Sequence, residues 1–122
     1  MRIEPTKPQP TFGYSHYLKT LYKKGQLPVK RGFYGEIISP KTVSLEHLNP
    51  ISKGGKTELS NLVLAHKDIN NKRSDKPLGE FLNLKAMSAY LEQFKNLKIG
   101  KFDGNKYIAM ILETVGNLLT GG

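Results

Sequence analysis

The chain contains no cysteine and no tryptophan, and it has few acidic residues. Its 122 residues include 10 Asp and Glu against 19 Lys and Arg, which gives a formal net charge of +9. Without cysteine, the chain can form neither a disulfide framework nor a zinc site with thiolate ligands, and thiol-dependent hydrolases and redox enzymes are excluded. The length is sufficient for one modest hydrophobic core, so a single domain is expected.

Long apolar runs are also missing. No stretch is long enough for a transmembrane helix, and the N-terminus lacks the charged start, apolar block and cleavage site of a secretory leader. We therefore expect a cytoplasmic protein that does not contact membranes. Hydrophobic residues make up 38% of the chain, which is adequate for a globular core, so the excess positive charge is expected on a folded surface.

The positive charge favours a polyanionic partner. Basic residues outnumber acidic ones most strongly in the first two thirds of the chain. Lys and Arg that neutralise phosphates release condensed counterions, so nucleic acid is the leading class of partner. On charge alone, a lysine-rich surface that merely keeps the protein soluble is an equally good explanation.

Proline, glycine and the apolar spacing divide the chain into segments. Residues 1–13 contain three prolines among polar residues and are expected to form an extended arm. Apolar residues at helical spacing predict a helix over 14–25, with Gly25 as its stop signal. Residues 80–119 show two apolar stripes with intervals of three and four, which predict two helices.

The middle of the chain has the pattern of two strands followed by a helix. Residues 43–48 alternate in polarity and end at Asn49-Pro50, which is typical of a strand. A polar loop leads to a second apolar strand over 62–65, and the polar residues 66–73 predict a surface helix.

Four polar residues accompany these elements: Glu46 and His47 at the end of the first strand, Asn61 at the start of the second, and Asn70 on the helix. Carboxylate and amide oxygens suit hard divalent cations, and a neutral imidazole suits proton abstraction. Taken singly, each residue is as well explained as a surface histidine, a helix cap or a turn former.

Together, these residues resemble the HNH endonuclease signature. The match runs through residues 45–55, 61–65 and 70–75, and Asn61 stands 14 positions after His47 while Asn70 stands 9 positions after Asn61. The resemblance covers roughly residues 32–78. It implies an α+β fold in which a ββα-metal core over 32–78 is buttressed by the N-terminal helix and the two C-terminal helices, so that residues 1–122 form a single HNH nuclease domain.

The resemblance also implies site residues and a reaction. His47 corresponds to the general base, and Asn61 to the residue whose side chain braces the loop and so helps hold the base in position. Glu46 and Asn70 correspond to the ligands of one Mg²⁺ or Mn²⁺ ion. The implied activity is hydrolysis of DNA phosphodiester bonds, by nicking or by cutting the duplex, with 5′-phosphate and 3′-hydroxyl products.

Two features of the sequence depart from the family pattern. The acidic ligand is more often Asp, so Glu46 adds one methylene between the backbone and the metal. Many small relatives carry a zinc ion held by two CxxC pairs, and the corresponding positions here are Gly32-Phe33-Tyr34-Gly35 and His66-Lys67-Asp68-Ile69. No structural zinc is expected, and packing must support the core instead.

The expected partner is double-stranded DNA, read with weak sequence preference because the contacts go to phosphates. The residues expected to make those contacts are Lys53, Lys56, Lys72, Arg73 and Lys76. Two alternatives remain open: a nuclease-derived binding or structural module with little catalysis, and a ribonuclease or toxin-like nuclease. Small proteins similar to this one are common in bacteriophages and mobile elements, which implies the host cytoplasm and a possible larger nuclease or packaging assembly.

Overall fold

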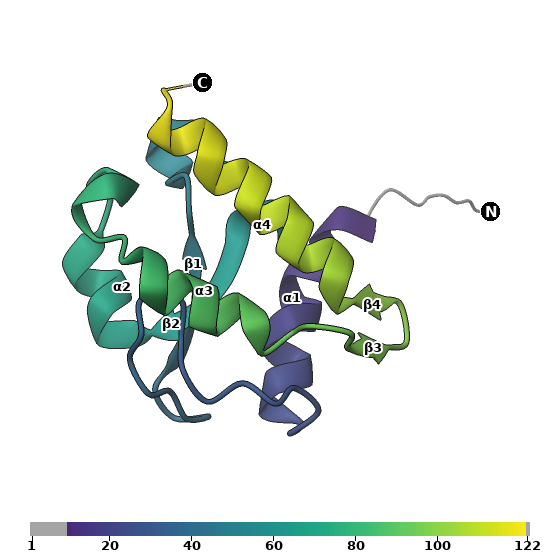
Figure 1. Ribbon diagram of the computed structural model, residues 1–122. Coiled ribbons are helices and arrows are strands. Elements are labelled where there is room, and N and C mark those ends of the chain that lie inside the picture. Colours follow the sequence, from purple (N-terminus) through teal and green to yellow (C-terminus); the bar gives the residue numbers. More distant parts are fainter. Residues whose placement is uncertain (1–9, 122) are drawn as a thin grey trace.

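Two antiparallel strands, β1 (Val43–His47) and β2 (Leu62–His66), lie at the centre of the molecule (Figure 1). The structure is a computed structural model that describes residues 10–121. The other elements are the helices α1 (Pro10–Lys23), α2 (Lys67–Arg73), α3 (Leu84–Glu92) and α4 (Gly104–Leu119), the short strands β3 (Lys98–Ile99) and β4 (Phe102–Asp103), and the single-turn helices η1 (Ile51–Lys53), η2 (Leu59–Asn61) and η3 (Leu78–Glu80). The mixed helix and strand content confirms the α+β class.

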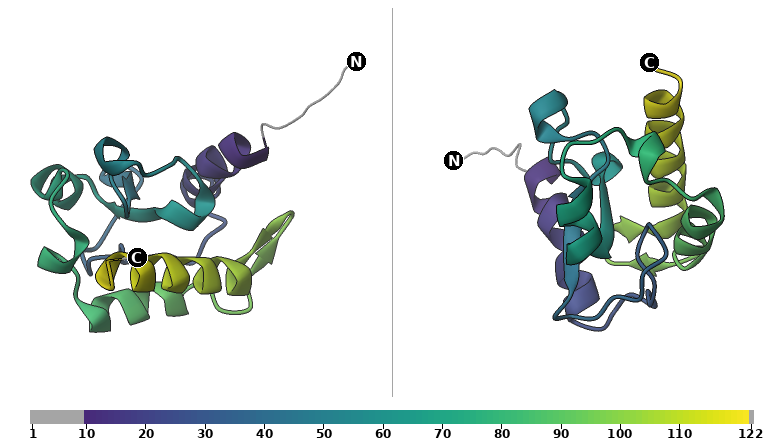
Figure 2. Two further views of the ribbon diagram at one scale, coloured as in Figure 1. Left: turned by 90° about the horizontal axis from the view of Figure 1, so that it is seen from above. Right: turned by 90° about the vertical axis from the view of Figure 1, so that its left-hand side faces the viewer.

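The central sheet lies between two helical layers. Figure 2 shows α1 on one side of the strands and the pair α3 and α4 on the other. Residues 62–65 of β2 are consequently buried on both faces, which explains why this strand is an uninterrupted apolar run. β1 pairs with β2 in a register that sets Leu45 opposite Leu64 and His47 opposite Leu62.

Side chains satisfy the backbone of β2 on the edge that β1 leaves free. The Tyr107 hydroxyl donates to the carbonyl oxygen of Leu62 at 2.8 Å, and the amide of Leu64 donates to the Tyr90 hydroxyl at 3.0 Å. The two hydroxyls are themselves 2.8 Å apart, and the Leu64 carbonyl accepts from the amide of Phe33 at 2.9 Å. Burial raises the pKa of both tyrosines above the usual range, so they remain neutral donors and acceptors.

An aromatic cluster joins these tyrosines to the rest of the core. Phe33 packs edge-on against Tyr90 with ring centroids 5.7 Å apart, and Phe94 packs against Tyr90 and Tyr107 at 5.1 and 4.8 Å. Phe33 belongs to a segment that the expected HNH resemblance aligns with a zinc-binding pair, and its side chain is completely buried. Apolar packing therefore supports this segment here.

The sequence-based boundaries are close to those observed, with two differences. α1 begins at Pro10, within the expected arm over 1–13, because proline is well tolerated in the first turn of a helix; residues 1–9 of that arm lie outside the described part of the chain. Gly25 follows α1 with φ +74°, as its expected role as a stop requires. The short strands β3 and β4 between the C-terminal helices were not expected.

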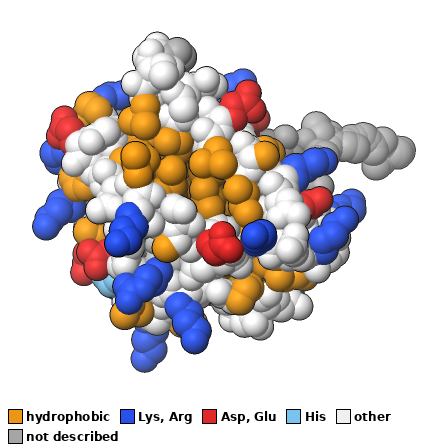
Figure 3. Space-filling view, viewed as in Figure 1, with side chains coloured by type: hydrophobic (Ala, Val, Ile, Leu, Met, Phe, Trp, Pro, Cys, Tyr) orange, Lys and Arg blue, Asp and Glu red, His pale blue; other side chains and the backbone are white. Residues whose placement is uncertain are grey.

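The outer face over α3 and α4 is apolar. Figure 3 shows hydrophobic side chains gathered across this face, with Lys and Arg toward its margins. A shallow groove between the two helices is lined by Met87, Leu91, Ile108 and Leu112. Among residues 10–121, no helix has both the length and the apolar character that crossing a membrane requires.

Candidate active site

Helix α2 follows β2 directly and packs across the outer edge of β1. Its start is capped by His66, whose Nδ1 accepts a hydrogen bond from the amide of Asp68 at 3.1 Å. Asn70 and Arg73 are three residues apart and therefore lie on the same face of the helix. Both side chains bond to backbone carbonyls of β1 and its continuation, so α2 is fixed to the strand that carries Glu46 and His47.

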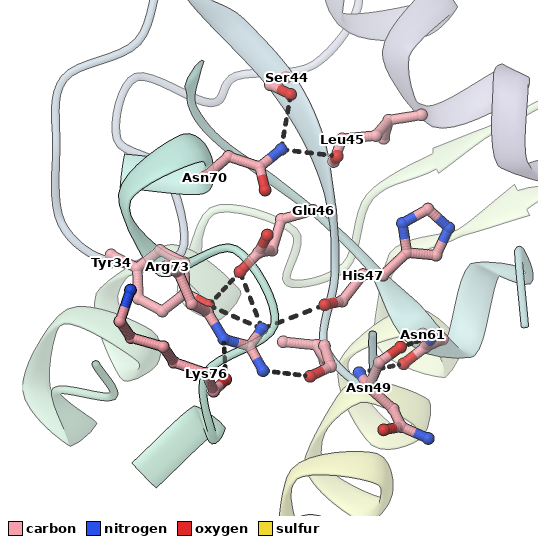
Figure 4. Close-up of polar contacts among 11 residues, drawn as sticks. Tyr34, Ser44, Leu45, Glu46, His47, Asn49, Asn61, Asn70, Arg73 and Lys76 are labelled. Atoms are coloured by element: carbon pink, nitrogen blue, oxygen red, sulfur yellow. Dashed lines mark hydrogen bonds and ion pairs between the residues drawn. The ribbon is translucent and has the colours of Figure 1, made fainter. Parts of the chain in front are cut away.

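Arg73 is the centre of a buried hydrogen-bond network (Figure 4). Its side chain is only 1% exposed. Its Nη1 donates to Oε2 of Glu46 at 2.9 Å and to the carbonyl of His47 at 3.1 Å, its Nη2 to the carbonyl of Leu48 at 2.8 Å, and its Nε to the carbonyl of Lys76 at 2.9 Å. The guanidinium thus ties the end of β1 to the end of α2.

Glu46 lies on the α2 side of β1 and is 2% exposed. Its Oε2 accepts hydrogen bonds from Arg73 and from the hydroxyl of Tyr34. Burial and the neighbouring Glu46 raise the pKa of Tyr34 far above its ordinary value, so the phenol stays protonated. No described residue donates to the second carboxylate oxygen, Oε1, which points toward the side on which Asn70 lies (Figure 4).

The orientation of the Asn70 amide is determined by its partners. Its Nδ2 donates to the hydroxyl of Ser44 at 2.8 Å and to the carbonyl of Leu45 at 3.1 Å. A carbonyl can only accept, so the nitrogen must face Leu45 and the amide oxygen must face the other way. In Figure 4 this oxygen is turned toward Glu46. Asn70 and Glu46 therefore each offer one uncommitted oxygen from adjacent elements.

His47 extends to the opposite side of β1, because successive side chains of a strand alternate. Its Nε2 lies 2.9 Å from the hydroxyl oxygen of Thr57, and the ring points away from Glu46 in Figure 4. Partial burial lowers the pKa of His47 below its usual 6.5, and the negative charge of Glu46 partly opposes this shift. The imidazole is consequently neutral at pH 7.

Asn61 braces the loop that follows His47. Its Oδ1 accepts from the amide of Asn49 at 2.8 Å, and its Nδ2 donates to the carbonyls of Asn49 at 3.0 Å and Lys56 at 2.8 Å. The loop closes so tightly that a Cβ atom on Gly55 would lie 1.8 Å from the carbonyl oxygen of Asn49. Only glycine fits this position, so the loop geometry depends on Gly55 as well as on Asn61.

The expected metal ligands fit a weakly held, oxygen-preferring cation. Mg²⁺ commonly takes one or two protein oxygens and completes its shell with water and substrate phosphate, and Glu46 Oε1 with Asn70 Oδ1 would supply such a pair. Within residues 10–121, no group of three or more His, Cys, Asp or Glu is arranged to hold a metal ion. The positive charge of Arg73 next to Glu46 also opposes tight cation binding.

The residues expected to contact DNA divide into two groups. Lys53, Lys56, Lys72 and Lys76 are exposed. Arg73 differs from the expectation, since its side chain is almost completely buried and its guanidinium is hydrogen-bonded to Glu46 and to backbone carbonyls instead of being presented on the surface. Arginine in the last turn of a polar helix is normally a surface residue, and nothing in its local sequence signals burial.

Sequence reasoning missed two contributors to the site. In the sequence, Tyr34 stands out only as a residue at a missing zinc position, and Thr57 lies in a polar loop with no pattern of its own. Both reach the site through tertiary contacts, Tyr34 to Glu46 and Thr57 to His47. Hydrogen-bonding side chains on irregular segments leave no periodic signal.

The chain was compared with protein-family models, curated proteins and solved structures. None of the three comparisons finds a match.

Proposed function

We propose that the chain is a metal-dependent endonuclease of the HNH type that hydrolyses phosphodiester bonds of DNA. In this proposal β1, β2 and α2 form the ββα-metal core, and His47 is the general base. The observation that carries the proposal is the arrangement at the end of β1: a neutral imidazole and a carboxylate on consecutive residues, with the amide oxygen of Asn70 turned toward that carboxylate.

In the proposed reaction, His47 takes a proton from a water molecule while the water oxygen forms a bond to the scissile phosphorus. The bond between phosphorus and the 3′-oxygen breaks, and that oxygen leaves as a hydroxyl after protonation by water. The products carry a 5′-phosphate and a 3′-hydroxyl. Glu46 and Asn70 would hold a divalent cation, which when bound would supply charge neutralisation at the phosphate and at the leaving oxygen.

Thr57 supports this role because it fixes one ring nitrogen of His47. When Nε2 carries the proton and donates to the Thr57 hydroxyl, Nδ1 is the basic nitrogen. No described residue occupies Nδ1. The Thr57 hydroxyl can donate as well as accept, so it fixes the orientation of the ring, and the proposed reaction uses the tautomer in which Nδ1 accepts the proton from water.

Exposed lysines around the site support a phosphate backbone as the ligand. Lys53 and Lys56 lie in the loop after His47, Lys72 lies in the last turn of α2, and Lys76 lies in the segment that follows α2. Their contacts would position the duplex without reading bases, so weak sequence preference is expected. The logarithm of the binding constant should fall with the logarithm of salt concentration by about 0.9 per phosphate contact.

Relaxation of supercoiled plasmid tests the activity directly. The purified protein should nick the plasmid with Mg²⁺ or Mn²⁺ and not with EDTA, and His47→Ala should abolish nicking without loss of DNA binding. Asn70→Ala should require much more metal. Two double variants that remove equal charge serve as a matched comparison. Lys53→Ala/Lys56→Ala removes two lysines near the site, and Lys85→Ala/Lys95→Ala removes two lysines on or beside α3. Only the first double variant should weaken DNA binding.

Two results would overturn the proposal. Cleavage that persists in His47→Ala excludes this residue as the base, and cleavage of RNA with no cleavage of DNA changes the substrate to RNA. If the wild-type protein binds DNA but cuts neither nucleic acid with any metal, the second candidate function applies.

That second candidate is a nucleic-acid-binding or structural module with little catalysis. The observation that favours it is the buried ion pair between Glu46 and Arg73, which gives the acidic residue a structural role and neutralises its charge. The apolar face over α3 and α4 is compatible with a place in a larger nuclease or packaging assembly. Under either function we propose a cytoplasmic protein, in the host cytoplasm if it is encoded by a bacteriophage.

A further inference from the structure

Tyr34 reaches Glu46 from the irregular segment between α1 and β1. Its hydroxyl donates to Oε2 of Glu46 and lies 3.4 Å from Nη1 of Arg73. The ring is held edge-on by Phe33 and Phe81, with centroid separations of 5.1 and 6.4 Å. The phenol is thus a rigidly placed donor, and it is aimed at one oxygen of one carboxylate.

The donors around Glu46 are distributed unevenly. Tyr34 and Arg73 both use Oε2, and no described residue uses Oε1. Arginine usually binds a carboxylate through two parallel hydrogen bonds. Here only Nη1 reaches Glu46, because Nη2 is committed to the carbonyl of Leu48. The carboxylate is therefore held by one oxygen, and the other oxygen is left on the side of Asn70.

We propose that Tyr34 is a positioning residue for divalent-cation binding: its hydroxyl holds Oε2 against Arg73 and thereby presents Oε1 of Glu46, with Oδ1 of Asn70, to the cation. This inference rests on the proposed function. Without the hydroxyl, the carboxylate is free to rotate about its terminal torsion, so that either oxygen can pair with Nη1 of Arg73 and Oε1 is no longer held on the side of Asn70. Removing a hydrogen-bonding group that orients a metal-ligating carboxylate typically weakens metal affinity by about 10–100-fold.

Tyr34→Phe is the decisive variant because it removes the donor and keeps the ring that packs against Phe33 and Phe81. Two controls accompany it. Tyr22→Phe removes the phenol hydroxyl of a tyrosine on α1, and that hydroxyl does not contact Glu46. Phe81→Leu loosens the packing around Tyr34 but keeps its hydroxyl.

The measurement is direct titration of each metal-free protein with Mn²⁺, followed by electron paramagnetic resonance of the free ion. Tyr34→Phe should bind Mn²⁺ at least about 10-fold more weakly than the wild type, while Tyr22→Phe and Phe81→Leu bind within about 2-fold of it. In the plasmid assay, Tyr34→Phe should need a correspondingly higher Mn²⁺ concentration for half-maximal nicking and should recover the wild-type rate at saturation.

The outcomes separate this inference from the proposed function. If the wild-type protein cuts DNA and Tyr34→Phe binds Mn²⁺ as well as the wild type does, the inference about Tyr34 is overturned and the proposed function is not. Equal weakening in Tyr34→Phe and Phe81→Leu also overturns it, because loosened packing then explains the loss. A wild-type protein that neither binds Mn²⁺ nor cuts DNA overturns both. A plasmid rate in Tyr34→Phe that stays low at saturating Mn²⁺ overturns the inference too, because the hydroxyl then acts in a step other than cation binding.

Discussion

Arg73 and Glu46 form an ion pair of 2.9 Å in which both side chains are almost completely buried. Replacing Arg73 by Met leaves the carboxylate buried without its counter-charge, which typically costs about 3–5 kcal/mol. The double variant Glu46→Gln/Arg73→Met should be less destabilised than Arg73→Met alone, because no unpaired charge remains. Urea unfolding of the three proteins measures this, and equal losses in the single and double variants would contradict the structural role of the pair.

The two tyrosine hydroxyls that bond to the backbone of β2 predict a second set of stability changes. Tyr107→Phe leaves the carbonyl of Leu62 without its donor, and Tyr90→Phe leaves the amide of Leu64 without its acceptor. Each loss should cost about 1–3 kcal/mol, the penalty for a buried unsatisfied polar group. The two hydroxyls also bond to each other, so a double-mutant cycle should give non-additive free energies of unfolding. Strict additivity would show that the pair acts as two independent bonds.

Ser74 ends α2 in a conformation that favours glycine, with φ 52° and ψ −122°. Backbone strain of this kind costs on the order of 1–3 kcal/mol in a residue that carries a Cβ atom. Ser74→Gly should therefore raise the free energy of unfolding by about 1 kcal/mol, after the entropy cost of glycine is deducted. Ser74→Ala, which keeps the Cβ atom and removes the hydroxyl, is the matched control and should give no gain.

The pKa of His47 predicts a dependence of stability on pH. Burial lowers this pKa in the folded protein below the 6.5 of the unfolded chain, so the unfolded state binds the proton more readily. The contribution to stability is complete above about pH 6.5 and is lost as the pH falls below it. Nuclear magnetic resonance titration of the metal-free protein should give a midpoint below 6.5. As the pH falls from 7 into the acid range, the free energy of unfolding should decrease less for His47→Gln than for the wild type.

A midpoint at or above 6.5 would show that the charge of Glu46 outweighs the burial of the ring. The ion pair with Arg73 argues against that result, because it offsets the negative charge that His47 experiences.

The elements with strong periodicity were predictable from the sequence, and those without it were not. β1 and β2 were visible as an alternating segment and an apolar run, and the stripes over 80–119 gave α3 and α4. The short strands β3 and β4 contain two residues each, too few for any period to emerge. α1 begins earlier than the sequence predicts, because proline is typical of an extended arm and is also well tolerated in the first turn of a helix, so Pro10 does not distinguish the two.

The features of the candidate site also divide into those that the sequence predicts and those that only the structure shows. Glu46, His47, Asn61 and Asn70 were found because each lies at a fixed distance along the chain from the others. That spacing carries no information about the side of β1 to which a carboxylate turns, nor about the buried position of Arg73. Those features depend on Tyr34 and on the carbonyls of His47 and Leu48, which only the tertiary structure brings together.

The hairpin of β1 and β2 has consequences for how other molecules can join it. The outer edge of β1 is occupied by Asn70 and Arg73, and that of β2 by Phe33, Tyr90 and Tyr107. An incoming strand finds these backbone groups already taken, so this sheet is closed to extension by a second chain and to edge-to-edge aggregation. Any assembly that includes this protein is therefore expected to contact it through surfaces other than the two edges of the β1–β2 sheet.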